Sequence, residues 1–499
     1  MRKALICAFA AGGLAASAHA AEIDWGSVKD PLPDTITWKG ITFYGTVDVG
    51  LAAMTTGAPI SGYLGTGYGY QMYGSPFNRS GQFGVAPNGL SQSTVGFKFE
   101  EKIGWDFTAV GRVETGFLPT SGNFADGCKS IQENNFRPTY LQTSNGDSSR
   151  CGQFLNGQVY AGVSSPAYGT LTAGRQNSIG LDIAAVYDPQ QLSYAFSFLG
   201  YTGNNQGGIG ATEDARWDDS LKYVYQYGPF HASAMWTQGG NDTAMFGGAW
   251  GAGAGFTYRG FSVDAWYEEV HGAVNISPLA VNSTLDRTLV NGSISDDWGW
   301  GIAAKYSFDW GGWGGYKDGW AGCYGGGLKD GPVCGKVTLY AGYNDVHSNL
   351  PQNPIPTELF QTIGGYTLAT NNFAFAGRER ELVWGGAAYE IGGWRFSAAY
   401  YWYGQNDFLT GTAAGVFSNC AAKTASNAAA KNAGTFFGNA VGSNCHGDAN
   451  QASFVIDYAF TKHFDVYVGY DWSEINGGFA SGALAKENNL VMTGVRLKW

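Results

Sequence analysis

Hydrophobic and polar residues alternate over residues 94–117, and this stretch predicts two antiparallel β-strands. Phe97 and Phe99 alternate with polar or small residues, and the alternation resumes from Trp105 after a short polar break. A period of two places successive side chains on opposite sides of a strand. In a soluble sandwich the apolar face would meet a second sheet. In a membrane barrel it would meet lipid, and the charged face would line a water-filled lumen.

The same alternation recurs along the chain and predicts sixteen strands. Long and short connections alternate between them, except at residues 309–335, where a short turn is expected. This segment is either a periplasmic insertion or an extra hairpin. The strand expected at 382–390 has no clear apolar face. The expected strands are 41–51, 94–100, 105–117, 158–163, 170–174, 220–226, 230–237, 250–258, 261–268, 298–308, 337–343, 382–390, 394–403, 454–460, 464–473 and 489–499.

Composition favours one large closed sheet over several soluble domains. The chain has 499 residues, of which 77 are glycine, 15% are aromatic and only 14% are charged. Soluble domains carry about 25% charged residues, and a soluble chain of this length usually divides into domains joined by visible linkers. No linker-like run stands out. An even number of strands lets the first pair with the last, which removes exposed edges.

The N-terminus reads as a secretory signal. Arg2 and Lys3 precede a short apolar run that ends in small residues, so we expect a signal peptide at residues 1–20. Residues 21–40 read as an irregular extension, and 41–499 as the barrel domain. No later run is apolar for the roughly 18–20 residues that a spanning helix needs.

Six cysteines remain after removal of the signal peptide, an even number that favours disulfides in an exported chain. Fifteen connectivities are open from sequence alone. Neighbours along the chain suggest three local pairs, and no spacing favours a metal site. The expected pairs are Cys128–Cys151, Cys323–Cys334 and Cys420–Cys445.

The formal net charge of −11 argues against nucleic acid as a partner. It says little about a pore, whose selectivity depends on the charges that line it.

Several short motifs resemble the general porin family of Gram-negative outer membranes. The resemblance covers nearly the whole mature chain and is strongest between residues 41 and 190. The last residue is Trp499, where that family usually has Phe. The motifs are Phe43-Tyr44-Gly45 with Asp48, Val95 to Lys98, Ala161 to Val163, Tyr168 to Gln176 and Val495 to Trp499.

The resemblance implies an all-β, transmembrane antiparallel barrel of about sixteen strands with short periplasmic turns and long extracellular loops. It also implies an outer-membrane location among outer-membrane lipids, a homotrimer, no cofactor, and passive diffusion of small hydrophilic solutes and ions. In that family the third external loop folds into the barrel and narrows it.

Carried over to this chain, the inward loop is residues 177–213, with Asp182 and Asp188 as its acidic members. Basic residues of the wall would face them and set a transverse field across the pore. The alternative is that these charges are only solvated lumen residues away from any constriction. The basic residues implied by the family are Lys98, Arg112 and Arg175.

Parity, meaning the alternation of side chains between the inner and outer face of a strand, supports part of this set of charged lumen residues. Lys98, Arg112 and Glu114 lie on the polar face of the first hairpin, and Lys222 lies on the polar face of 220–226. Arg175 conflicts with parity, because strict alternation from the preceding strand sends it towards lipid. Only the family resemblance predicts that Arg175 faces the lumen.

Other function classes remain open from sequence. A substrate-selective porin for sugars or small anions is the rival within the channel class. An outer-membrane hydrolase or a secreted all-β adhesin are rivals outside it. The histidines are scattered and no catalytic signature is present, so we expect no enzymatic activity.

Overall fold

The computed structural model describes residues 35–64, 80–138, 141–144, 150–202, 215–240, 245–281, 283–310, 335–354, 360–371, 375–411, 417–419, 445–480 and 485–499. The expected signal peptide and Cys323, Cys334 and Cys420 lie outside these ranges. Among the described helices, none combines the length and the apolar character that a membrane span requires.

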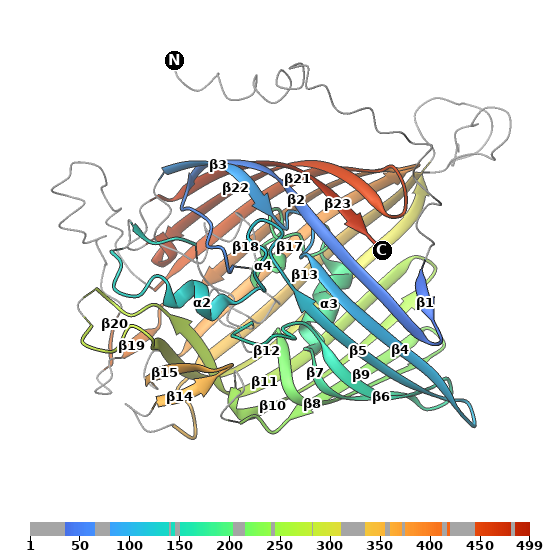
Figure 1. The fold of residues 1–499 in the computed structure, drawn as a ribbon, viewed down its shortest axis with the longest axis horizontal. Helices are drawn as coiled ribbons and strands as arrows, with labels where there is room; N and C mark the ends of the chain where they lie inside the picture. The colour runs from blue at the N-terminus through green and yellow to red at the C-terminus, as the bar shows by residue number, and fades with distance from the viewer. Residues whose placement is uncertain are drawn as a thin grey trace, which may run out of the picture.

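Sixteen strands close into one antiparallel barrel (Figure 1). The first wall strand pairs with the last, with Thr46 opposite Lys498, so the sheet has no open edge. The wall strands are β2 (Ile41–Gly57), β4 (Thr94–Gly104), β5 (Phe107–Gly116), β6 (Val159–Ser165), β7 (Gly169–Asn177), β8 (Arg216–Tyr227), β9 (Phe230–Thr237), β10 (Met245–Tyr258), β11 (Phe261–Ser277), β12 (Val290–Trp310), β13 (Gly335–Asn349), β17 (Arg378–Ile391), β18 (Trp394–Gln405), β21 (Gly447–Ala459), β22 (Phe464–Gly477) and β23 (Glu487–Lys498).

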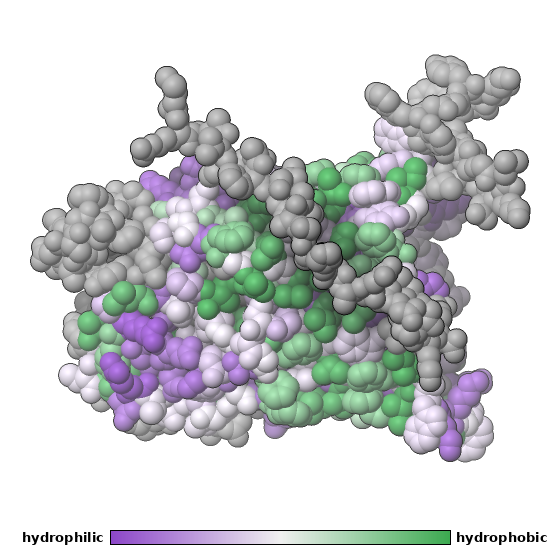
Figure 2. Space-filling model, turned by 45° about the horizontal axis from the view of Figure 1, so that its top comes forward, coloured by the Kyte–Doolittle hydropathy of each residue, from purple (hydrophilic) through white to green (hydrophobic). Residues whose placement is uncertain are grey.

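The alternation predicted from the sequence places apolar side chains on the outside of this wall. Phe97, Leu171 and Val383 are all exposed. Figure 2 shows hydrophobic side chains spread over the wall, with hydrophilic ones gathered at the end that carries the long loops. Each expected strand coincides with a wall strand. Several observed strands are longer, because backbone pairing continues past the point where the outer face stops being apolar.

Two short strands lie where irregular segments were expected. β1 (Ile36–Trp38) falls in the expected extension and pairs with the start of β2. β3 (Ser80–Pro87) falls in the expected loop 52–90 and pairs with the end of β2. β3 has only two large outward residues, Phe83 and Val85, which is too short a pattern to predict a strand.

Apart from the connection at 309–335, the long connections lie at one end of the barrel (Figure 1). They contain β14 (Phe360–Ile363), β15 (Tyr366–Asn371), β16 (Phe375–Ala376), β19 (Leu409–Gly411), β20 (Phe417–Asn419), α2 (Gly127–Gln132) and the 3-10 helix Gly478–Ala480. Cys128 and Cys151 form a disulfide, with 4.8 Å between their Cα atoms, and both pack against Val274 and Leu368. Cys445 is also disulfide-bonded, and its expected partner lies outside the described residues.

The unusual connection at 309–335 joins two neighbouring strands, because β12 and β13 pair as far as Trp310 opposite Gly335. The choice between an insertion and a hairpin depends on residues 311–334, which lie outside the described residues. The facing of β17, which the sequence left open, is now defined. Val383 is outward and 42% exposed, whereas Trp384 is inward and 2% exposed.

A hydrophobic core lies inside the barrel, where the sequence predicts a water-filled lumen. It forms because α3 (Ile179–Tyr187) and α4 (Phe198–Thr202) lie within the ring of strands (Figure 1). The core joins helix residues to inward-facing wall residues, chiefly Ile179, Ile183, Tyr187, Phe198, Trp217, Trp266, Trp384 and Tyr401.

Candidate functional site

The expected inward loop, residues 177–213, is described as far as residue 202. This described part enters the barrel, begins with α3 and is called the inward loop below. Ser178 caps this helix, because its Oγ accepts a hydrogen bond from the backbone N–H of Leu181 at 3.1 Å. A wall residue caps it as well, since Oε1 of Glu268 on β11 accepts from the N–H of Gly180 at 3.0 Å. Both acceptors satisfy N–H groups that a helix terminus leaves unpaired.

α3 has one buried face and one exposed face. Ile179, Ile183 and Tyr187 recur every four residues and pack against the wall. On the other face the Asp182 side chain is 49% exposed and Val186 is 45% exposed. Both lie within the ring of strands, so the barrel holds space beside the helix.

Wall side chains hold the end of α3. The Tyr187 hydroxyl hydrogen-bonds the Ser262 Oγ at 2.6 Å and donates to the Asp264 carboxylate, which His231 also contacts at 2.7 Å. On β17, the Trp384 indole N–H donates to the Tyr187 carbonyl at 3.1 Å. The helix is therefore fastened to β9, β11 and β17.

Asp182 lies opposite a basic wall residue, as the sequence predicts. Its carboxylate pairs with the Lys222 ammonium, which also donates to the Asn177 carbonyl at 3.0 Å. Lys222 is only 8% exposed at its side chain. It therefore fastens the start of the inward loop to β8 and presents little charge to solvent.

Asp188 lies inside the barrel but is 1% exposed, so it does not present its charge to the lumen. Its carboxylate accepts from the backbone N–H of Gln190 at 3.1 Å and of Leu192 at 2.7 Å. The hydroxyls of Ser197 and Tyr401 also donate to it. Burial raises the pKa of Asp188, and these hydrogen bonds oppose that shift. Its place in the expected constriction is corrected to that of a residue that shapes the loop.

The wall near the start of the barrel carries a second charged cluster. Arg112 donates through Nε to the Tyr44 hydroxyl at 2.7 Å and pairs with Glu114, and Tyr44 donates to Glu114 at 2.9 Å. Lys98 is opposite Arg112 across the strand pair and lies 5.2 Å from the centre of the Tyr44 ring.

The side chain of Arg175 is only 10% exposed, because polar groups near the end of its strand hold it. The neighbouring strand β8 has an extra residue at this point, since Gly174 is opposite Ser220 whereas Gln176 is opposite Trp217. Arg175 then pairs with Asp218 and donates to the Gly157 carbonyl at 3.0 Å. Thr172 and Gln176 lie on the same face of β7 and hydrogen-bond each other, so the alternation of β7 continues past Arg175, and its polar partners are what shield its charge.

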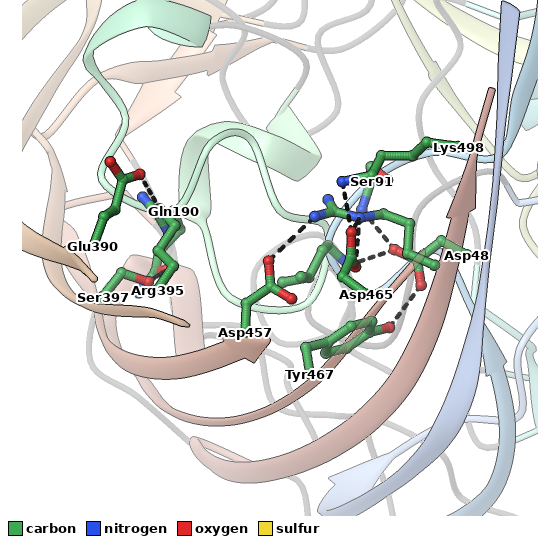
Figure 3. Close-up of polar contacts among 12 residues, drawn as sticks. Asp48, Ser91, Gln190, Glu390, Arg395, Ser397, Asp457, Asp465, Tyr467 and Lys498 are labelled. Carbon is green, nitrogen blue, oxygen red and sulfur yellow. Dashed lines mark hydrogen bonds and ion pairs between the residues drawn. The ribbon is translucent and has the colours of Figure 1, made fainter. Parts of the chain in front are cut away.

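Figure 3 shows an ionic network on the inner wall that sequence reasoning missed. Arg496 pairs with Asp457 at 3.3 Å and with Asp465 at 3.0 Å, and Lys498 pairs with Asp465 at 2.6 Å. The alternating Val495-Arg496-Leu497-Lys498 was a usable signal, because it places both cations on the inner face of the last strand.

Asp48 organises the break between β3 and β4. Its carboxylate accepts from the N–H groups of Leu90 and Ser91, both at 2.8 Å, and from the Tyr467 hydroxyl at 2.7 Å (Figure 3). The inward loop reaches this break, since the Ser193 hydroxyl donates to the Gly89 carbonyl at 2.7 Å. The loop thus spans the barrel from β7 to the β3–β4 break.

Within the part of the chain that the structure describes, potential metal ligands come together on the outer face of the barrel. The group with suitable spacing is Asp345, His347 and Glu379, on the outer face of β13 and β17.

The sequence model of Gram-negative porins matches residues 4–478. None of the curated proteins compared with the chain matches it. Among solved structures, the anion-selective porin from Comamonas acidovorans is 13% identical with a TM-score of 0.52, covering 92% of this chain and 99% of that chain.

Two further solved structures are similar. OmpF of Salmonella typhi, in complex with daunomycin, is 15% identical with a TM-score of 0.47, covering 93% of this chain and 100% of that one. The outer membrane channel DcaP of Acinetobacter baumannii is 14% identical with a TM-score of 0.45, covering 92% and 97%. The family match, over a closed barrel of sixteen strands, shows that the chain belongs to the Gram-negative porins, outer-membrane channels for passive diffusion.

Proposed function

We propose that ions and small hydrophilic solutes cross the barrel along the exposed face of α3, between the inward loop and the wall formed by β2 and β4–β8. The exposure of Asp182 and Val186, at 49% and 45% inside a closed barrel, carries this proposal. The buried face of the loop is fastened to β9, β11, β17 and β18, so the opposite side is the one left for solutes.

The charges along this route favour small anions over cations. Asp188 is buried, and Asp182 is paired with Lys222. On the wall, Lys98 is exposed and contacts an aromatic ring, while the pairing of Arg112 with Glu114 leaves the arginine 24% exposed. Lysine and arginine side chains along a pore favour anions. The anion-selective porin is therefore our second candidate, and a reversal potential close to the anion equilibrium potential would distinguish it from a general porin with a mild anion preference.

The test is current through planar bilayers containing the refolded mature protein under a salt gradient. We expect ohmic steps and a reversal potential on the anion side. Asp182→Asn removes the exposed acid and should shift the reversal potential further towards anions, whereas Lys98→Gln should shift it towards cations.

Glu101→Gln is the matched control, because Glu101 follows the outward Phe97 and Phe99 in parity and should not alter selectivity. A bilayer that stays sealed with folded protein would refute the channel. Unchanged reversal potentials in both Asp182→Asn and Lys98→Gln would show that these two residues do not line the route. The channel proposal itself would stand.

We further propose a homotrimer, as the family resemblance implies. The outer face of β4–β7 has an apolar hollow of about 500 Å³, lined by small outward residues beside Phe99, such as Ala109, Gly111, Ala161 and Ala173. A second copy of the chain would cover these residues.

We propose transport without catalysis. His231 and Asp264 form the histidine–carboxylate pair nearest the loop, and both act with Tyr187 to hold it. Incubation with phospholipid and peptide substrates tests this. Hydrolysis that disappears in His231→Ala, with conductance retained, would favour the hydrolase instead.

A further inference from the structure

Charges on the first residues of β17 alternate in sign, and the barrel separates them onto two faces. Arg378 and Arg380 point inward, where Arg378 donates to the Gln405 side chain at 3.0 Å and Arg380 donates to Ser348 at 2.6 Å. Glu379 and Glu381 share the parity of the exposed Val383, so they point outward. The arginines therefore cannot neutralise their neighbouring glutamates.

β13 adds a carboxylate and an imidazole to the same outer surface. His347 is directly opposite Glu379, and Asp345 is directly opposite Glu381. Ligand atoms of Asp345, His347 and Glu379 all lie within 4.8 Å of one another. His347 Nε2 is 3.2 Å from Asp345 Oδ2.

The negative charge of this cluster is not balanced by cations within the described residues. No described lysine or arginine forms an ion pair with Asp345, Glu379 or Glu381. Tyr343 donates to Glu381 at 2.8 Å, which leaves the charge in place. The Asp345 Oδ1 atom is buried without a hydrogen-bond partner in the described structure, and a buried unpaired carboxylate oxygen is costly.

The imidazole is held in a fixed orientation. The ring of Trp298, opposite His347 on β12, stacks on it with 3.9 Å between ring centres and 4° between planes. Two rigid, fully paired strands carry the other two ligands. A site whose ligands are already oriented loses little entropy when it binds an ion.

We propose that Asp345, His347 and Glu379 bind a divalent transition-metal cation, with Zn²⁺ as the best-fitting ion. One imidazole nitrogen and two carboxylates match the ligand types and number of zinc sites that keep a position open for water. The nitrogen ligand disfavours Ca²⁺ and Mg²⁺, which prefer oxygen ligands only. The cation would supply the missing positive charge and a partner for the buried oxygen of Asp345. The site faces outward at the end with the long loops, so it is separate from the diffusion route.

The test is isothermal titration of the tag-free, metal-stripped mature protein in detergent with Zn²⁺ alone, followed by metal analysis of the dialysed complex. We expect a saturable site that binds Zn²⁺ more tightly than Ca²⁺ or Mg²⁺. The double variant H347Q/E379Q should lose affinity at this site by at least about tenfold. The variant H271Q/E269Q removes a neighbouring histidine–glutamate pair and should leave this isotherm unchanged.

Heat-modifiable migration on gels checks that every variant is a folded barrel. Failure of the folded wild-type protein to bind Zn²⁺ at millimolar concentration would overturn the proposal, and so would wild-type affinity in H347Q/E379Q. If that variant does not fold, the single variant Glu379→Gln replaces it, with the same tenfold criterion.

Discussion

Two aspartates of one loop, six positions apart, have different physical roles. Asp182 is half exposed and is paired with Lys222 on the wall, whereas the buried carboxylate of Asp188 gathers donors from its own loop and from Tyr401 of β18. The net charge of the sequence counts the two aspartates equally. Their surroundings differ because Asp188 ends α3, where the chain turns back towards the wall.

Replacement of Asp188 by alanine should destabilise the inward loop. Tyr401, Ser197 and two backbone N–H groups would lose their acceptor, and buried donors without partners cost about 1–3 kcal/mol each. We expect the free energy of unfolding in lipid vesicles, measured by urea titration, to fall by at least about 2 kcal/mol, with noisier single-channel current. Val186→Ala is the control, because Val186 lies on the exposed face of the same helix and its truncation should leave stability unchanged. A quiet, fully stable Asp188→Ala channel would contradict this role.

At the scale of elements, the inward loop fits the wall because glycines leave room for it. A Cβ atom built at Gly469 on β22 would lie 2.5 Å from the ring of Phe196, and one at Gly386 on β17 would lie 2.6 Å from Pro189. Phe196 is fully buried, so its ring has no free space to enter. The many glycines of the chain thus also serve the contact between loop and wall.

Gly469→Ala should loosen the inward loop by overpacking against Phe196. Such insertions cost about 1–3 kcal/mol. We expect altered step conductance in bilayers and a lower urea midpoint. Gly385→Ala is the matched control on β17, since its Cβ would make an ordinary contact at 3.6 Å. Equal effects from the two substitutions would mean that the barrel wall, and not the loop contact, responds.

At the scale of the whole molecule, closure of the barrel brings its first wall strand, β2, against its last, β23. Gly45 and Trp499 exchange backbone hydrogen bonds, both at 3.1 Å, and Trp499 packs on Phe43 with 5.8 Å between ring centres. The indole of Trp499 therefore packs at the junction where the first and last wall strands meet. The inward loop then joins opposite walls, so the lumen is divided by a packed core.

Ala161→Trp should weaken the proposed trimer by filling the apolar hollow on β4–β7. A tryptophan at an outward position is compatible with lipid, so the monomer should still fold and conduct. Chemical cross-linking and native electrophoresis should show fewer trimers than in the wild type. Ala398→Trp, on the outer face of β18, is the control and should leave assembly unchanged. Intact trimers in Ala161→Trp would place the subunit contact elsewhere.

The sequence by itself determined the sixteen wall strands, the facing of most of them and the closed sheet, because a period of two is a local property of the chain. It also placed Lys98, Arg112, Glu114 and Lys222 on the inner face, since each lies in a stretch of unbroken alternation. It could not show that Arg175 pairs with Asp218 of the neighbouring strand. Short or weakly apolar strands such as β3 contain too few alternating apolar positions to be predicted from the sequence.

Only the tertiary structure decided what the loops do to those faces. The burial of Asp188, the pairing of Asp182 and the aromatic core around Trp384 depend on residues that are 40 to more than 200 positions apart and meet inside the barrel. The outward cluster of Asp345, His347 and Glu379 likewise required two strands in a particular register. Parity assigns a side chain to a face, but long-range packing determines which neighbours, water or lipid it finds there.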